Sequence, residues 1–284
     1  MTRPDAPRDS RTPDPMHFER HAGTYGQARP PYPPQLWARL RDLGLLDPGL
    51  RAIDLGAGTG QATGPMLAAG LAVTAIEPGT NLAEALQVAH PGATVIIQPA
   101  EDLDLPPGSF DIAVAATSIH WMDLGVLLPK VRRLLTPTGR LLVWRNVFGD
   151  PEQTRTPFRD AVARIVATRT TPSRPGRDPE DLHATSAALT HTGLFAVQEQ
   201  HTYRWSLDLD EHSLRRLFTT FSDWTPDEVD QAARAVRDLG GRVTEHYHSW
   251  LIILSPREHQ APYDTDHFHP EQRPTLHRWQ DRQS

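Results

Sequence analysis

The stretch Asp54-Leu55-Gly56-Ala57-Gly58-Thr59-Gly60 decides the fold. Its glycines directly follow a predicted strand over residues 51–55 and precede a helical pattern over residues 61–69. Glycines between a strand and a helix let the backbone adopt positive φ values and approach a ligand closely. The spacing is G-x-G-x-G, and Gln61 stands where the dinucleotide fingerprint has its third small residue. The loop therefore predicts an adenosine-type ligand and argues against a nicotinamide oxidoreductase.

Glu77 supplies a second polar group at the same expected edge. It directly follows the apolar run Leu71–Ile76. A carboxylate there can accept hydrogen bonds from both hydroxyls of a ribose. A ligand without a pyrophosphate needs no Lys or Arg in the glycine loop, and the loop has none. The alternative is a glycine turn of another α/β enzyme, with Glu77 a solvated residue at the end of its strand.

Apolar runs alternate with helical patterns through residue 147. Strands are predicted over residues 51–55, 71–76, 93–97, 110–115, 140–147, 195–207 and 242–254, the last two as an antiparallel pair at the sheet edge. Helices are predicted after Pro33-Pro34 and over residues 61–69, 81–89, 124–135, 156–168, 211–221 and 226–239, with a loop at 169–179. The order predicts an α/β, Rossmann-like fold. It has a seven-stranded, mostly parallel sheet, helices on both faces, an antiparallel edge strand and a helical lid or cap.

Composition separates one folded domain from two polar ends. Residues 1–15 are expected to form a disordered leader that lacks the apolar region of a secretory signal. The folded domain spans residues 16–255, with a lid at 16–45, a ligand-binding core at 46–150, and cap helices and last strands at 151–255. Residues 256–284 form a polar, His-rich tail.

Charge and cysteine content exclude several function classes. The chain has 284 residues and a net charge of −6, with no dominant basic block, so nucleic acid is a poor default partner. It has no cysteine, which excludes disulfides, zinc–thiolate sites and thiol nucleophiles. No apolar run reaches the length of a membrane span. We expect a cytoplasmic monomer or homodimer without a metal site or a membrane partner.

Several motifs in order resemble the class I S-adenosylmethionine methyltransferases. The chain looks most like the trans-aconitate methyltransferase-like, small-molecule branch. Phe18, Ala22, Tyr25, Arg29-Pro30 and Tyr32-Pro33 fit the N-terminal F-x3-A-x2-Y-x3-R-P-x-Y-P signature of that branch. The glycine loop, Ala100-Glu101-Asp102-Leu103, Pro107-Gly108-Ser109-Phe110-Asp111 and Ser118-Ile119-His120-Trp121 also fit. The resemblance covers residues 16–147 strongly and Phe218–Trp224 with the last two strands more weakly.

The resemblance implies S-adenosyl-L-methionine as cofactor and a small-molecule methyl acceptor. It implies cofactor contacts from Tyr25, Arg29, Asp54, Gly56, Ala57, Gly58, Thr59, Gly60, Glu77, Pro78, Ala100, Glu101 and Thr117. Pro99 stands just before Ala100, where many members carry an Asp for the adenine amino group. Glu101, or the backbone of Ala100 and Glu101, is expected to make that contact instead.

The catalytic roles stay open between two interpretations each. Arg29 is expected to pair with the methionine carboxylate, since a guanidinium suits a carboxylate; the alternative is a solvated surface Arg. His120 is a candidate general base, or it only orients the acceptor through hydrogen bonds. Trp121 lines the acceptor pocket, or it packs in the core. An acceptor carboxylate is already ionised and needs no base, so positioning alone would suffice.

The remaining histidines favour structural interpretations. His259, His267, His269 and His277 lie in the polar tail, where a solvated tail is favoured over a weak metal site. His246 and His248 alternate along the last predicted strand and are expected on an edge strand.

Two function classes remain. The first is an enzyme that methylates an oxygen acceptor, for instance a carboxylate, with carbon or nitrogen of a secondary metabolite left open. The second keeps the fold and the cofactor without methyl transfer, as a cyclase, a decarboxylase or a binding module.

Overall fold

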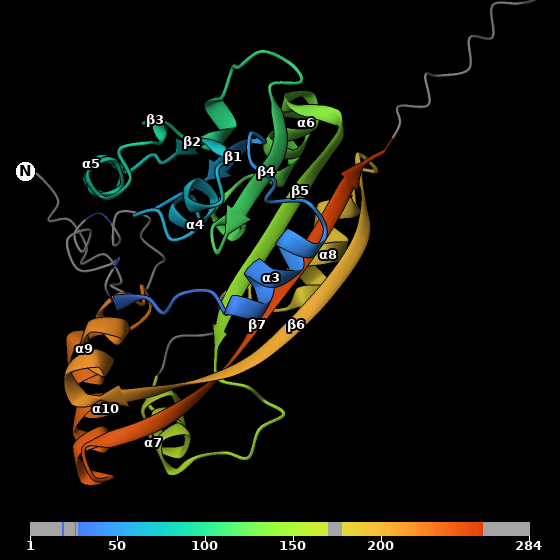
Figure 1. The fold of residues 1–284 in the computed structure, drawn as a ribbon. Helices are drawn as coiled ribbons and strands as arrows, with labels where there is room; N and C mark the ends of the chain where they lie inside the picture. Colours follow the sequence, from blue (N-terminus) through green and yellow to red (C-terminus); the bar gives the residue numbers. More distant parts are fainter. Residues whose placement is uncertain (1–18, 20–25, 27, 170–177, 258–284) are drawn as a thin grey trace, which may run out of the picture.

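A seven-stranded sheet organises the described part of the chain, in the order β3-β2-β1-β4-β5-β7-β6 (Figure 1). The computed structural model describes Glu19, Gly26 and residues 28–169 and 178–257. The strands are β1 (Arg51–Leu55), β2 (Ala72–Ile76), β3 (Thr94–Ile96), β4 (Phe110–Ala116), β5 (Leu135–Phe148), β6 (Phe195–Asp210) and β7 (Arg242–Pro256). β1 to β5 run parallel, and β7 runs antiparallel to both β5 and β6.

Helices cover both faces of this sheet, because its central strands are apolar on both sides. The helices are α3 (Pro34–Asp42), α4 (Thr63–Ala68), α5 (Thr80–Ala89), α6 (Leu124–Leu134), α7 (Pro157–Ala167), α8 (Leu182–Thr190), α9 (Glu211–Thr219) and α10 (Pro226–Asp238). Two short 3₁₀ turns are η1 (Ala100–Asp102) and η2 (Ile119–Trp121).

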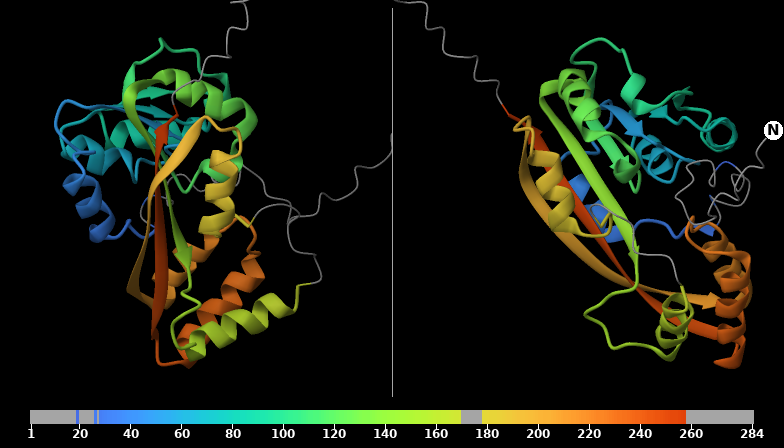
Figure 2. Two further views of the ribbon diagram at one scale, coloured as in Figure 1. Left: turned by 90° about the vertical axis from the view of Figure 1, so that its right-hand side faces the viewer. Right: turned by 180° about the vertical axis from the view of Figure 1, so that it is seen from behind.

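Alternate residues of one strand enter different cores. Ala52 of β1 packs with Leu36 and Leu40 of α3 on one face. Ile53 of β1 packs with Leu127 of α6 on the other. Figure 2 shows α6 and α8 on the face opposite α3. The two cores together fix the register of the central strands, since a slip of one residue would exchange the faces.

The strands β5, β6 and β7 extend beyond the others and carry a separate helical cap. Helices α7, α9 and α10 gather at the far end of β6 and β7 (Figure 1). They share a third core, in which Phe158, Phe218 and Tyr247 are buried together. The cap helices begin at side-chain caps that the sequence provides. Thr156 accepts from the backbone N–H of Arg159, and Thr225 and Glu228 form a capping box.

The predicted fold class is confirmed, including the antiparallel pairing of the edge strand β6 with β7. The expected edge position of His246 and His248 is wrong, because β7 lies between β5 and β6. His246 Nδ1 lies 2.8 Å from the Ser206 hydroxyl, and His248 Nδ1 donates to the Gly149 carbonyl at 3.0 Å. β7 lies inside the sheet because it pairs with β5 on one side and with β6 on the other along most of its length.

Two further differences concern segments of weak apolar pattern. The sequence does not predict helix α8, because its residues LHATSAALT are small and apolar without a clear stripe. Strand β5 begins at Leu135 instead of Arg140, since Leu135 already pairs with Phe110 before an irregularity in the ladder.

Several predictions lie outside the described residues. These are the leader at 1–15, the lid residues Phe18, Ala22 and Tyr25, most of the loop at 169–179, and the tail histidines. Within the described residues, no helix combines the length and apolarity needed to cross a bilayer.

Candidate active site

The glycine loop turns sharply between β1 and α4. Gly56, Gly58 and Gly60 have φ values of 66°, 59° and 92°, a region that other residues adopt only with strain. A Cβ built on Gly56 would lie 2.8 Å from the Cβ of Ser118, so the loop also passes too close to η2 for a side chain. The N–H of Ala57 donates to the Ile76 carbonyl at 3.0 Å, which holds the loop against the end of β2. Thr59 is buried within the loop.

Glu77 fixes the loop from the neighbouring strand. One carboxylate oxygen accepts from the backbone N–H of Gly58 at 2.8 Å, and the other accepts from that of Gly79 at 2.9 Å. Burial raises the pKa of Glu77, and these two backbone hydrogen bonds oppose the rise. Each carboxylate oxygen has a further lone pair, so the group can still accept from ligand hydroxyls. Pro78 follows it and is exposed.

Asp54 lies beneath the loop and has no exposed surface. One of its oxygens accepts from the Thr63 hydroxyl at 2.7 Å, and the other has no partner among the described residues. Burial raises the pKa of Asp54 to about 7. The side chain therefore supports the first turn of α4 from inside, and the predicted contact of Asp54 with the cofactor stays a prediction.

Glu19 belongs to the same edge, and the sequence patterns gave no signal for it. Its carboxylate accepts from the backbone N–H groups of Asn81 and Leu82, at 3.0 and 3.3 Å, in the first turn of α5. Gly79 lies between Glu19 and Glu77, and a Cβ there would overlap the Glu19 carboxylate, which would then have to shift. A residue of the predicted lid thus reaches the edge of the sheet at which Glu77 lies.

The turn η1, expected to border the adenine, lies beside the start of α6. Ala100 is buried, and the Glu101 carboxylate accepts from the backbone N–H of Asp123 at 2.8 Å. That bond uses one carboxylate oxygen and leaves acceptor capacity on the other.

Thr117 and Ser118 connect the end of β4 to its neighbours. Thr117 has a φ of 62°, the single positive value of a non-glycine residue in the described part of the chain. Its hydroxyl lies 3.0 Å from the Tyr32 hydroxyl, and its N–H donates to the Trp144 carbonyl. Ser118 donates to the Leu55 carbonyl at 2.6 Å, just before the glycine loop. Such strain at a strand end is typical of functional sites, where surrounding contacts maintain it.

His120 and Trp121 follow on η2, with ring centroids 4.9 Å apart. Nη1 of Arg145, on β5, lies 3.1 Å from Nδ1 of His120. A guanidinium has only donors, so Nδ1 of His120 is the accepting nitrogen and the ring proton lies on Nε2. Arg145 is a site residue that the sequence motifs missed, because its strand gives no sign of which neighbour it reaches.

Arg29 lies between the lid and the cap. It donates to the Thr220 carbonyl at 2.8 Å, and its guanidinium lies 4.7 Å from the centroid of the Phe221 ring. These contacts bring the N-terminal signature to the Phe218–Trp224 segment, the two ends of the resemblance. The predicted pairing with a methionine carboxylate stays a prediction.

These groups converge at the carboxyl ends of β1, β2 and β4, where α/β sheets bind ligands. The glycine loop has no side chain at Gly56, Gly58 or Gly60, so a ligand can approach its backbone closely. The Glu77 carboxylate offers acceptors for vicinal hydroxyls. The residues present therefore fit an adenosyl ligand.

Comparison with known proteins agrees with this geometry. Residues 53–143 match the family described as the methyltransferase domain. An uncharacterized methyltransferase of Mycobacterium tuberculosis is 36% identical over 132 residues, covering 46% of this chain and 53% of the relative. A candidate methyltransferase of Dictyostelium discoideum is 32% identical over 143 residues, covering 46% and 51%. The chain spans about half the length of these curated relatives.

Solved structures extend the likeness beyond that core. A candidate type II methyltransferase from Anaeromyxobacter dehalogenans has a TM-score of 0.60 and 25% identity, covering 80% of this chain and 97% of its own. A phosphoethanolamine N-methyltransferase of Haemonchus contortus, solved with S-adenosylhomocysteine, has a TM-score of 0.51 and 16% identity, covering 86% and 58%. The fold is that of the class I methyltransferases, and the matches support an S-adenosylmethionine-dependent methyltransferase.

The substitution Gly56→Ala tests the close approach of the loop to Ser118. We expect it to lower the free energy of unfolding by about 2–4 kcal/mol, from left-handed strain plus overlap. Gly108→Ala is the matched control, since Gly108 has a φ of 65° and open space around its Cα. Its cost should be about 1–2 kcal/mol, from strain alone. Urea unfolding of both variants makes the comparison, and equal costs would contradict the overlap.

Burial of Asp54 predicts a pH dependence of stability. The folded-state pKa of about 7 lies above the ordinary value of 3.8, so the folded protein holds the proton more tightly. Stability is therefore highest at low pH for this group and falls as the pH rises toward 7. Between pH 5 and pH 8 the loss from Asp54 should be about 2–3 kcal/mol. Over the same pH range, the free energy of unfolding of Asp54→Asn, measured with urea, should fall by about 2–3 kcal/mol less than that of the wild type. An equal fall in both proteins would contradict the raised pKa of Asp54.

Proposed function

We propose that this protein binds S-adenosylmethionine and transfers its methyl group to a small-molecule acceptor. One observation carries the proposal: the Glu77 carboxylate, held by the N–H groups of Gly58 and Gly79, faces a loop built from three positive-φ glycines. That loop lies inside the stretch that matches the methyltransferase domain.

Different segments of the chain would bind different parts of this cofactor. Glu77 accepts from the ribose hydroxyls, the glycine loop lies under the methionine portion, and η1 with Glu101 borders the adenine. Arg29, and Tyr25 of the N-terminal signature, would close over it from the lid. Bound S-adenosylmethionine supplies an electrophilic methyl carbon; an acceptor lone pair bonds to it while the C–S electrons stay on the departing S-adenosylhomocysteine sulfur.

His120 would orient the acceptor and not remove its proton. Nδ1 accepts from Arg145, so the ring proton lies on Nε2, and Nε2–H is a donor and not a base. A donor suits an oxygen acceptor that is already ionised. We therefore propose a carboxylate oxygen as the methylated atom, and the chain then contributes positioning. Trp121 would form the apolar wall beside it.

Binding of the cofactor is the first test, with Glu77→Gln as the variant. We expect the wild type to bind S-adenosylmethionine and S-adenosylhomocysteine with Kd values on the order of 1–100 μM in isothermal titration calorimetry. The amide nitrogen that this substitution introduces would face a backbone N–H, so binding should weaken at least about tenfold. Glu84→Gln, exposed on the neighbouring helix α5, is the control and should bind like the wild type. A folded wild type that binds neither ligand would overturn the proposal.

Formation of S-adenosylhomocysteine separates methyl transfer from binding alone. A panel of small carboxylic acids, alcohols and amines is incubated with the protein and the cofactor, and the product is measured by mass spectrometry. Cofactor binding without product across the panel would favour a binding module, cyclase or decarboxylase over a methyltransferase.

The role of His120 is tested on the first acceptor that turns over. His120→Gln keeps a side-chain donor near the position of Nε2 but removes a base. We expect kcat/KM to fall less than about tenfold, whereas His120→Ala should lose about a hundredfold. Equal, large losses in both variants, together with loss of a limb that the wild type shows in its pH profile, would identify a base.

A further inference from the structure

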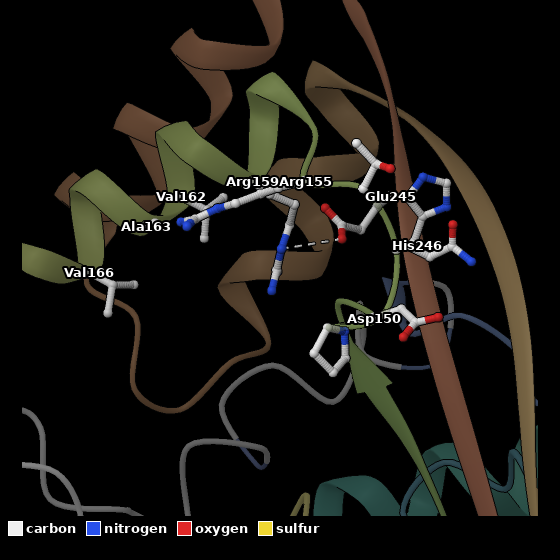
Figure 3. Close-up of a pocket in the computed structure, with 11 residues that line it drawn as sticks. Asp150, Arg155, Arg159, Val162, Ala163, Val166, Glu245 and His246 are labelled. Atoms are coloured by element: carbon white, nitrogen blue, oxygen red, sulfur yellow. Dashed lines mark ion pairs between the residues drawn. The ribbon is translucent and has the colours of Figure 1, made fainter.

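A cavity of about 450 Å³ lies in the cap, away from the candidate active site. It is bounded by α7, by the segment that follows β5, and by β7 (Figure 3). Its wall includes Val162, Ala163 and Val166 from α7, Asp150 from the segment, and Glu245 from β7. No residue of the glycine loop, of Glu77–Gly79 or of Thr117–Trp121 lines it.

Glu245 is a buried carboxylate whose side chain lacks a hydrogen bond within the described part of the chain. Its exposed fraction is 0%, and neither oxygen has a partner among the described residues. The nearest cation is Arg159, whose Nε lies 3.7 Å from one oxygen, beyond hydrogen-bond distance. Buried charges are normally both paired and hydrogen-bonded, because desolvation is otherwise costly. Burial raises the pKa of Glu245 to about 7, opposed by Arg159.

The other charged groups of the cavity are already engaged. Asp150 pairs with Arg204 at 2.9 Å, and Arg155 pairs with Asp160 at 2.9 Å. Glu245 and Arg159 form an ion pair with each other at 3.7 Å, but no hydrogen bond joins them, so both keep hydrogen-bonding capacity for a ligand.

Arg159 is held in place but keeps donors. Its guanidinium lies 4.9 Å from the centroid of the Phe148 ring, and a Cβ at Gly149 would overlap it. No hydrogen bond from its side chain to another described residue accompanies these contacts, and about a third of the side chain is exposed. Figure 3 shows it extending from α7 between Glu245 and the Asp150 segment. A guanidinium fixed in this way is preorganised for a carboxylate.

We propose that this cavity binds a free α-amino acid with an apolar side chain. The ligand ammonium would donate to Glu245, the ligand carboxylate would accept from Arg159, and the side chain would pack on Val162 and Val166. The carboxylate and guanidinium of the protein lie side by side, as do the ammonium and carboxylate of an amino acid that would pair with them. A purely cationic ligand would face Arg159, and a purely anionic ligand would face Glu245.

L-leucine is the probe, with two truncated controls. 3-Methylbutylamine lacks the carboxylate of leucine, and 4-methylpentanoate lacks its ammonium. The full chain is labelled with ¹³C in its valine methyl groups, and the Val162 and Val166 signals are followed during titration. We expect saturable shifts with L-leucine and a Kd on the order of 1 mM. Both truncated compounds should bind at least about tenfold more weakly, since each leaves one protein charge unmatched.

Variants assign the two charges. Glu245→Gln and Arg159→Met should each weaken L-leucine binding at least about tenfold. Glu199→Gln, on β6 beside Arg39 and outside the cavity, should leave the Kd unchanged. The methyl spectrum reports folding of each variant; if Glu245→Gln does not fold, Glu245→Met and Arg159→Met carry the test. The proposal is overturned if L-leucine does not bind at about ten times the expected Kd, if a truncated compound binds as well, or if folded variants bind like the wild type.

Discussion

The hydrogen bonds between the Glu77 carboxylate and the backbone of Gly58 and Gly79 join the two loops that form the ligand-binding edge. The loops meet because β1 and β2 are parallel neighbours, with Leu55 opposite Ile76. Each loop begins one residue beyond that pair. The carboxylate thus satisfies two backbone donors that would otherwise lie buried at the mouth of a ligand site. The positive φ values of the glycines allow the first loop to present its N–H toward β2.

The side proposed for the acceptor depends on a different constraint, the length of β5, β6 and β7. These strands continue past the carboxyl ends of β1 and β4, so the cap helices stand beside the proposed cofactor edge and not on the sheet face. Phe148 at the end of β5 packs edge-on against Phe218 and Tyr247, which ties the cap to the sheet. Arg29 reaches Thr220 from the N-terminal side. Arg29 therefore joins the predicted lid to the cap, two segments that lie far apart in the sequence.

The elements with strong periodicity could be predicted from the sequence, and those without it could not. β1 matched its predicted bounds because a short, mostly buried segment ends at a glycine loop. Helix α8 escaped because Ala-rich segments have no stripe, and their burial follows from tertiary packing. Motifs located Gly56, Glu77 and His120, since spacing carries those signals. They did not locate Glu19 or Arg145, whose contacts depend on three-dimensional register. Nor did they show that Asp54 faces Thr63 from below.

Asp54 and Glu245 are both fully buried. Their surroundings differ, and the difference favours a structural role for Asp54 and a ligand-binding role for Glu245. Asp54 accepts from the Thr63 hydroxyl within one strand–loop–helix unit, so part of its desolvation cost is offset inside the fold. Glu245 has no such donor among the described residues, although it lies beside a cavity and a guanidinium. An apolar residue at position 245 would fit among Val243 and the other buried cap residues without this cost. A destabilising group kept beside a cavity is what binding sites show when stability is given up for recognition. The same reasoning does not extend to Asp54, because its environment already explains it.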